Sequence, residues 1–215
     1  YKQKLLSSGK DFSYRYNGFV KMFGMLLDTK PDGPFTIIET GSLRVAGNWK
    51  DGQSSLLFWD FLQQYGGKLI TIDLNCKASA TTRNVLTAFK APNAMTQLET
   101  ICEDSVAALY KLSQKIPAIK ADLLYLDSFD LNHSNPTPSM VHHLKEFISV
   151  SPVINRSPNI VIAIDDSSNK KDYGKGKFVH DWAKTTDHKP MYHEYQLVYQ
   201  FNLGMSPDLS ALDHQ

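Results

Sequence analysis

The stretch FTIIETGSLRVAGNWKDGQSS, residues 35–55, runs from a predicted strand into the start of a predicted helix. Its first residues are mostly apolar or β-branched, which is typical of a buried strand in a parallel sheet. Between strand and helix lies a loop with three glycines, Gly41, Gly47 and Gly52, and no hydrophobic pattern. Ligands of open α/β sheets bind at the carboxyl ends of the strands, so this loop marks the predicted binding crevice.

Strand-like and helix-like segments alternate along the rest of the chain. The alternation predicts an α/β fold with a doubly wound sheet and right-handed crossovers. Runs rich in leucine and β-branched residues predict buried strands at 35–40, 68–73, 121–127 and 159–166, with a weaker strand at 96–102. Amphipathic patterns predict helices over 11–28, 53–65, 79–90, 105–115, 138–149 and 175–184. The stretch 190–202 favours two strands joined by a short turn, or one long bent strand.

Composition narrows the classes of partner. The 215 residues suit one α/β domain better than two. With 23 basic and 22 acidic residues, the formal charge of +1 gives no electrostatic support for a nucleic-acid partner. No apolar run approaches the roughly 18 residues of a membrane span, so we expect no membrane insertion.

Three further features of the sequence concern the cellular compartment, the parent protein and a surface loop. Cys76 and Cys102 have no metal-ligand spacing, and they are predicted to be packing residues of a protein in a reducing, cytoplasmic compartment. The chain begins at Tyr1 rather than at a methionine, which leaves open a processed product or a domain of a larger multidomain parent. A homo-oligomer is a separate open expectation. The lysine-rich run at 169–177 indicates a solvated loop, or a lid that moves on its glycines.

Every strong predicted strand ends in a carboxylate. These acids are Glu39, Asp73, Asp127 and the pair Asp165 and Asp166. Any one of them could simply cap the helix that follows it. Because the carboxyl ends of parallel strands meet at one edge, we expect all five to crowd one crevice. Crowded carboxylates repel one another unless a cation, a hydroxyl-rich ligand or protonation relieves them.

Asp73 suggests what the crevice binds. An acid at the end of the second strand, after a glycine-rich first loop, is placed to accept hydrogen bonds from ribose hydroxyls, as in NAD or S-adenosylmethionine sites. The compact G-x-G-x-x-G phosphate cradle is missing here, which favours a nucleoside without a diphosphate. In the third loop, Asp104 could reach a purine amino group, and Ser105 could serve there too or only cap the next helix.

The order of these loops resembles class I S-adenosylmethionine-dependent methyltransferases. The matching features are E-x-G at 39–41, the acid Asp73, E-D-S at 103–105 and L-D-S at 126–128. The resemblance implies a Rossmann-like, mostly parallel seven-stranded sheet with a C-terminal antiparallel hairpin. It also implies an N-terminal helical cap at 1–34, a methyltransferase domain at 35–204 and a C-terminal tail at 205–215.

A closer likeness is to metal-dependent small-molecule O-methyltransferases, including the cephalosporin-hydroxylase-like subgroup. It rests on DGQSS (51–55), YLDSFDLN (125–132) and IAIDDSSNKKDYGKGKFVHDW (162–182). It implies a divalent cation, Mg²⁺ above all, held by Asp127, Asp165 and Asp166, and hard oxygen donors of this kind suit Mg²⁺ better than Zn²⁺. Asp127, Asp130 and His133 become the candidate catalytic residues. The residues implied around the cofactor are Glu39, Gly41, Ser42, Ser54, Asp73, Asp104 and Ser105.

The sequence thus predicts an S-adenosylmethionine-dependent O-methyltransferase that acts on a hydroxyl of a small molecule or sugar with the help of a divalent metal. Two alternatives stay open. One is a nicotinamide-dependent oxidoreductase, against which the missing glycine fingerprint counts. The other is a non-catalytic, cofactor-binding module of a larger protein.

Overall fold

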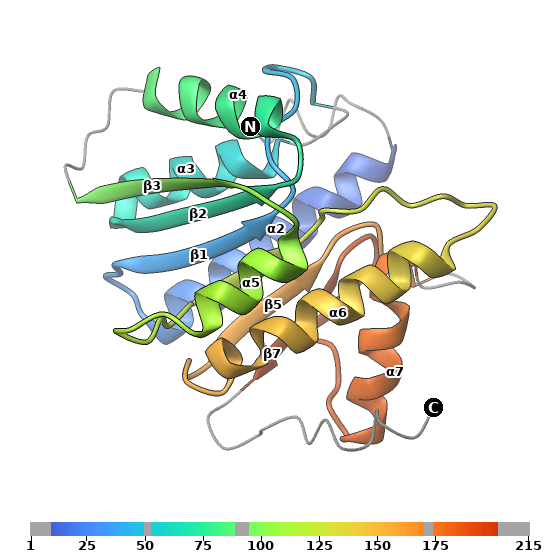
Figure 1. The fold of residues 1–215 in the computed structure, drawn as a ribbon. Coiled ribbons are helices and arrows are strands. Elements are labelled where there is room, and N and C mark those ends of the chain that lie inside the picture. The colour runs from blue at the N-terminus through green and yellow to red at the C-terminus, as the bar shows by residue number, and fades with distance from the viewer. Residues whose placement is uncertain (1–9, 50–52, 89–94, 170–173, 202–215) are drawn as a thin grey trace.

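A computed structural model describes residues 10–49, 53–88, 95–169 and 174–201 of the chain. Within these residues one sheet holds seven strands in the order β3-β2-β1-β4-β5-β7-β6 (Figure 1). The first five strands of that order are parallel, whereas β7 runs antiparallel to both β5 and β6. The predicted fold class is confirmed. The strands are β1 (Phe35–Thr40), β2 (Gly67–Asp73), β3 (Thr96–Cys102), β4 (Leu123–Leu126), β5 (Ile160–Ile164), β6 (Tyr192–His193) and β7 (Leu197–Phe201).

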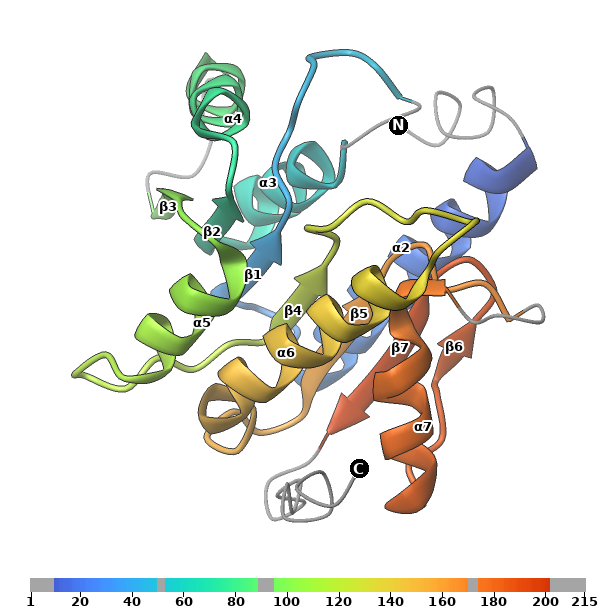
Figure 2. The ribbon, with the colours of Figure 1, turned by 45° about the vertical axis from the view of Figure 1, so that its right-hand side comes forward.

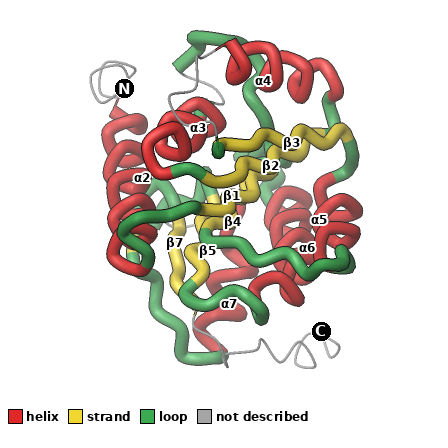
Figure 3. Tube along the Cα trace, turned by 90° about the vertical axis from the view of Figure 1, so that its left-hand side faces the viewer, coloured by secondary structure: helices red, strands yellow, loops and turns green. Residues whose placement is uncertain are grey.

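Helices cover both faces of the sheet, and Figure 3 shows α2 and α3 on one side with α5 and α6 on the other. Side chains of β1 alternate between the two layers, so Ile37 packs on the α2–α3 side and Ile38 on the α5–α6 side. This double burial explains why the central strands lack a polar face. The helices are α2 (Lys10–Thr29), α3 (Ser54–Tyr65), α4 (Cys76–Ala88), α5 (Ser105–Ser113), α6 (Thr137–Ile154) and α7 (Lys177–Thr185), preceded by the short 3₁₀ turn η1 (Gly174–Gly176).

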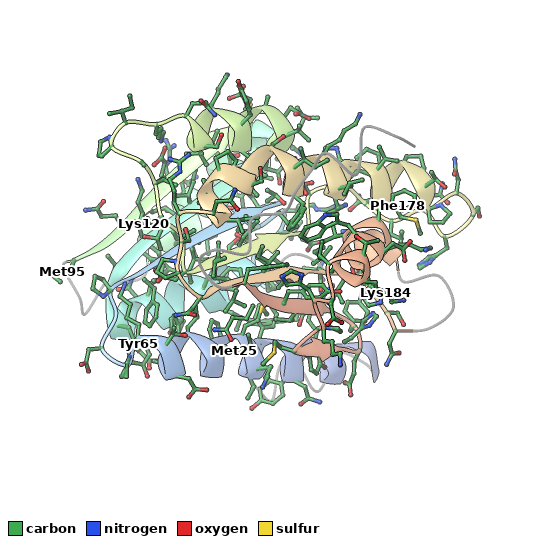
Figure 4. All side chains as sticks on the ribbon, turned by 90° about the horizontal axis from the view of Figure 1, so that it is seen from below. Met25, Tyr65, Met95, Lys120, Phe178 and Lys184 are labelled. Atoms are coloured by element: carbon green, nitrogen blue, oxygen red, sulfur yellow. A yellow bond between two sulfur atoms is a disulfide. The ribbon has the colours of Figure 1, made fainter. Side chains whose placement is uncertain are left out.

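The N-terminal helix α2 packs directly on the sheet. Its Phe19, Met22, Met25 and Leu26 are buried in the same core as strand residues of β1 and β5. Figure 4 shows Met25 extending from α2 toward the sheet. The predicted domain limits at 34/35 and 204/205 stay predictions, and the tail at 205–215 lies outside the described residues. None of the described helices has the length and hydropathy needed to span a membrane.

Two helices differ from their predicted extents by three or more residues at one end. Helix α4 begins at Cys76, directly after β2, rather than near residue 79. Helix α6 continues past residue 149 to Ile154 and includes Pro152 in its last turn. Val153 and Ile154 are buried against the sheet there, and that apolar packing offsets the cost of a proline near the helix end.

The two cysteines correct a prediction. Cys76 and Cys102 form a disulfide with their Cα atoms 4.9 Å apart, so they are not free packing residues. Asp73 of β2 stands beside Cys102 of β3 in the parallel register, which brings the first turn of α4 next to the end of β3. The spacing of 26 residues alone does not reveal that neighbourhood. The cytoplasmic location stays a prediction.

Candidate functional site

The carboxyl ends of the central strands border a pocket. Figure 2 shows the loops after β1, β2 and β4 leaving the sheet at the same end. The pocket between these loops is open to solvent and spans about 520 Å³, open solvent included. Its lining residues are Gly41, Ser42, Arg44, Ser54, Asp73, Asn75, Asp127, Ser128 and Asp130. The structure thus brings together Gly41, Ser42, Ser54 and Asp73, four of the seven residues predicted to surround a cofactor.

Asp73 presents a half-buried carboxylate to this pocket. Its Oδ2 accepts a hydrogen bond from the Ser42 amide at 2.9 Å, and its Oδ1 accepts one from the Asn75 amide at 2.7 Å. Each carboxylate oxygen can accept a second hydrogen bond, so the group retains capacity for ligand hydroxyls. Burial raises the pKa of Asp73, and the two backbone hydrogen bonds act in the opposite direction. The amides hold the carboxylate in place at the end of β2.

Glu39 has a different surrounding from the one predicted. Its side chain is fully buried and accepts hydrogen bonds from the hydroxyls of Ser54 and Ser55, the latter at 2.6 Å. It does not line the pocket, where Ser54 stands instead. Burial raises the pKa of Glu39 to about 8, although both serine hydrogen bonds favour the charged form. Glu39 therefore ties the start of α3 to β1, one step behind the pocket wall.

This buried acid predicts a pH dependence of stability. Unfolded Glu39 loses its proton near pH 4.5, whereas the folded side chain keeps it up to about pH 8. Between these values the folded state binds more protons, so the free energy of unfolding falls as pH rises, by about 4 kcal/mol from pH 5 to pH 8. We expect Glu39→Gln to remove this part of the decline. Urea denaturation at both pH values measures it, and equal declines in the two proteins would contradict the assignment.

Gly41 is required by the protein itself. Its φ is 83°, and a Cβ at this position would lie 2.5 Å from the carbonyl oxygen of Asp127. The loop after β1 and the loop after β4 therefore touch through their backbones. The close neighbour of Gly41 in the structure is the backbone at Asp127.

Asp104 and Ser105 stand apart from the pocket. Asp104 is exposed and caps α5 by accepting a hydrogen bond from the Ala107 amide at 3.0 Å, so it has the capping role that was considered for Ser105. Ser105 is buried, and its hydroxyl lies 2.9 Å from Nε2 of His142. Neither residue is among those that line the pocket in the described part of the chain. Their predicted contact with a purine stays a prediction.

Asp130 and His133 follow β4 in an exposed loop. Asp130 lines the pocket and pairs with Arg44 through two hydrogen bonds, at 2.6 and 3.0 Å. The Arg44 guanidinium lowers the pKa of the Asp130 carboxyl. His133 is exposed to solvent and is not among the pocket's lining residues. Their catalytic roles stay predictions.

Three acids meet where β4 and β5 end. One carboxylate oxygen from each of Asp127, Asp165 and Asp166 lies within 4.8 Å of the others, as the sequence predicts. Two cationic side chains are already there. The ammonium of Lys175 lies 2.5 Å from Oδ1 of Asp127 and 3.1 Å from Oδ2 of Asp166. The guanidinium of Arg15 lies 2.5 Å from Oδ2 of Asp165.

Sequence reasoning missed both cations. Arg15 belongs to α2 and stands 150 positions before its partner Asp165, so no local pattern connects the two. Lys175 sits in the lysine-rich run, where a solvated loop is the ordinary interpretation; that interpretation is wrong for this residue, because Lys175 is 1% exposed. The glycines on either side of Lys175 were the available signal. A Cβ at Gly174 would lie 1.8 Å from the carbonyl oxygen of Asp166, so the turn is packed tightly against β5's end.

The three carboxylates do not suit a divalent cation as they stand. Mg²⁺ needs six oxygen ligands near 2.1 Å, usually from a few carboxylates and several waters. Here Lys175 bridges two of the three acids and Arg15 binds the third. Two cations paired with three carboxylates leave one net negative charge for a metal to compensate. Lys175 would have to leave Asp127 and Asp166 before a metal could be held between them.

A second, smaller pocket lies between α2 and the acidic cluster. Asp127 borders this pocket as well as the first one. Asp165 also borders it, and its Oδ1 is buried without a hydrogen-bond partner among the described residues. The remaining lining residues are Arg15, Phe19, Trp49, Gln53, Ser54, Leu57 and Tyr125. The space is about large enough for one water molecule, and aromatic and polar groups surround its carboxylates.

Solved structures of methyltransferases share this fold. The crystal structure of CalS11, a calicheamicin methyltransferase, matches with a TM-score of 0.57 at 14% identity, over 90% of this chain and 80% of that one. The apo structure of CalS11, described as a TDP-rhamnose 3'-O-methyltransferase, matches with a TM-score of 0.58 at 15% identity, over 90% and 81%.

A third solved structure is MycE, a methyltransferase from the mycinamycin biosynthetic pathway in complex with Mg and SAH. It matches with a TM-score of 0.54 at 10% identity, over 86% of this chain and 50% of that one. No protein-family model and no curated protein matches the chain. The likeness establishes that this chain has the fold of class I methyltransferases.

Proposed function

We propose that this protein is an S-adenosylmethionine-dependent methyltransferase that methylates a hydroxyl group of a small molecule or sugar. The observation that carries the proposal is the pocket at the ends of β1, β2 and β4, with the Asp73 carboxylate fixed by two backbone amides and open to further hydrogen bonds. The shared fold with CalS11, described as acting on TDP-rhamnose, supports the reaction and the acceptor class.

The residues present suit the cofactor. Asp73 would accept hydrogen bonds from the two ribose hydroxyls, the usual role of an acid after the second strand. Gly41, Ser42 and Ser54 would line the methionine end, where backbone and hydroxyl groups can pair with its amino and carboxylate groups. When bound, S-adenosylmethionine supplies an activated methyl group. The sequence after β1 lacks the compact G-x-G-x-x-G cradle for a diphosphate, which disfavours the nicotinamide alternative.

The acceptor would approach from the side of the second pocket, which would have to widen to admit it. Asp127 borders both pockets, so it is the group best placed to accept the proton of an acceptor hydroxyl. Trp49, Phe19 and Tyr125 supply apolar walls, and the open Oδ1 of Asp165 can accept a further hydrogen bond from the acceptor. Holding the acceptor oxygen in line with the methyl group then supplies most of the acceleration.

The proposed reaction uses no divalent cation. The MycE complex contains Mg, which supports a metal in this fold. In this chain, however, Lys175 and Arg15 already pair with the acids that would hold a metal.

Calorimetric titration with S-adenosylhomocysteine tests the cofactor, because the demethylated product occupies the same site. We expect a single site with a micromolar Kd, and transfer of a radiolabelled methyl group from S-adenosylmethionine to nucleotide sugars or polyhydroxylated small molecules. NADH titrated by fluorescence is the control, and no binding is expected. Binding of NADH without S-adenosylhomocysteine would favour the oxidoreductase alternative, and binding without transfer to any acceptor would favour the non-catalytic module.

A further inference from the structure

We infer that Lys175 supplies the positive charge at the acidic cluster, in place of a divalent cation, so that the wild-type protein neither binds nor needs one there. The part of this inference that concerns methyl transfer rests on the proposed function. The part that concerns metal binding does not, since it can be measured without any reaction.

The position of Lys175 is built by the backbone around it. Its amide donates a hydrogen bond to the carbonyl of Asp166 at 3.1 Å, and the next amide, of Gly176, donates to the Ser167 hydroxyl at 2.8 Å. Gly174 has a φ of 53° and leaves no room for a Cβ against Asp166. Two hydrogen bonds and one close packing contact thus hold the 3₁₀ turn η1 against the residues that follow β5. This attachment fixes the direction in which the Lys175 side chain leaves the backbone.

The ammonium occupies the place that a metal would need. It contacts Asp127 at the end of β4 and Asp166 after β5, and thereby links the two loops that a metal would otherwise join. The side chain is almost completely buried, so bulk water does not replace these contacts. Two carboxylates in contact with the ammonium favour its charged form.

Arg15 completes the charge compensation from the other side. Its guanidinium contacts Asp165 and lies 3.5 Å from Asp166, and it stands 4.8 Å above the ring of Tyr195. The Tyr195 hydroxyl in turn donates a hydrogen bond to Asp166. Three carboxylates thus face two cations and a phenol. A divalent ion added here would lie against two like charges that have little exposure to water, which a metal site avoids.

The consequence for the reaction is a positioning role. Lys175 holds Oδ1 of Asp127, the carboxylate that borders both pockets. A fixed positive charge beside this acid also stabilises negative charge that develops on an acceptor oxygen during transfer. In metal-assisted enzymes a divalent ion performs both tasks.

Manganese binding provides the direct test, with Mn²⁺ followed by its electron paramagnetic resonance signal as the 215-residue protein is added. We expect no binding of Mn²⁺ to the wild-type protein at Mn²⁺ concentrations up to about 1 mM, because the Lys175 ammonium fills the site. Lys175→Met removes the charge and keeps the length of the side chain, which uncovers a cluster with two excess negative charges. We expect this variant to bind one Mn²⁺ at least about tenfold more tightly than wild type. Lys177→Met, a change two residues away at a lysine that pairs with Asp181, is the matched control and should gain no site.

Two measurements on wild-type protein test the inference even if the Lys175→Met variant does not fold. Treatment with EDTA should leave S-adenosylhomocysteine affinity and methyl transfer unchanged. Micromolar binding of one Mn²⁺ by wild type, lost in Asp166→Asn, would overturn the inference. If S-adenosylhomocysteine fails to bind while Mn²⁺ is also excluded, the proposed function is wrong and the cation assignment holds.

Discussion

Asp73→Ala is expected to weaken the binding of S-adenosylhomocysteine at least about 100-fold. Two ribose hydroxyls lose a charged acceptor, and hydrogen bonds to a charged group contribute about 1.5–3 kcal/mol each. The Ser42 and Asn75 amides also lose their common partner, so the loop after β1 loses one of the contacts that hold it against β2. Calorimetric titration of the wild-type and variant proteins measures the difference. Thermal unfolding of both shows whether the variant is folded.

Asp122, at the amino ends of the parallel strands, provides a matched control for this substitution. Asp122, just before β4, accepts a hydrogen bond from the Thr36 amide at 2.7 Å, which is the same kind of bond that Asp73 makes. Asp122→Ala should lower stability while leaving the cofactor affinity within a factor of about two of wild type. An Asp73→Ala protein that binds S-adenosylhomocysteine as tightly as wild type would remove the ribose role of Asp73.

Gly41→Ala is expected to lower the free energy of unfolding by about 3 kcal/mol and to abolish cofactor binding. Part of the loss comes from forcing a φ of 83° on an L-residue, which costs about 1–2 kcal/mol. The rest arises because the new Cβ would press on the carbonyl of Asp127, and backbone atoms on both sides can give way only by moving whole loops. Those are the loops that form the pocket, so the same displacement removes the binding geometry. Urea denaturation and calorimetry measure the two effects.

Gly47→Ala separates the cost of a positive φ from the cost of a steric clash of the new Cβ. Gly47 lies in the same loop with a φ of 76°, and no atom lies within 4 Å of the Cβ that the substitution would add. We expect a loss of about 1 kcal/mol and retained cofactor affinity. Equal losses in the two variants would mean that the contact between Gly41 and Asp127 contributes nothing beyond the backbone conformation.

Much of the fold could be predicted because its signals are local. The apolar runs at 35–40 and 159–166 are long enough to indicate strands, and the helical patterns between them leave few alternatives to a doubly wound sheet. Helix ends were less predictable. The additional turn at the end of α6 depends on Val153 and Ile154 packing against the sheet, which is a tertiary contact.

For the candidate site too, local features could be predicted from the sequence and tertiary contacts could not. That Asp127, Asp165 and Asp166 converge follows from the sequence, because parallel strands deliver their carboxyl ends to one edge. The partners of these acids do not follow from it. Arg15 arrives from a helix 150 positions away, and the disulfide of Cys76 with Cys102 depends on β2 and β3 being neighbours.

By itself, then, the sequence determined the order of strands and helices and the edge at which five acids gather, since both depend on residue periodicity and chain direction. The tertiary structure decided which charges those acids meet, which of them face the pocket and which, like Glu39, lie buried behind it. Charge pairing and burial depend on distances in space between segments far apart in the chain. No spacing along the sequence encodes those distances.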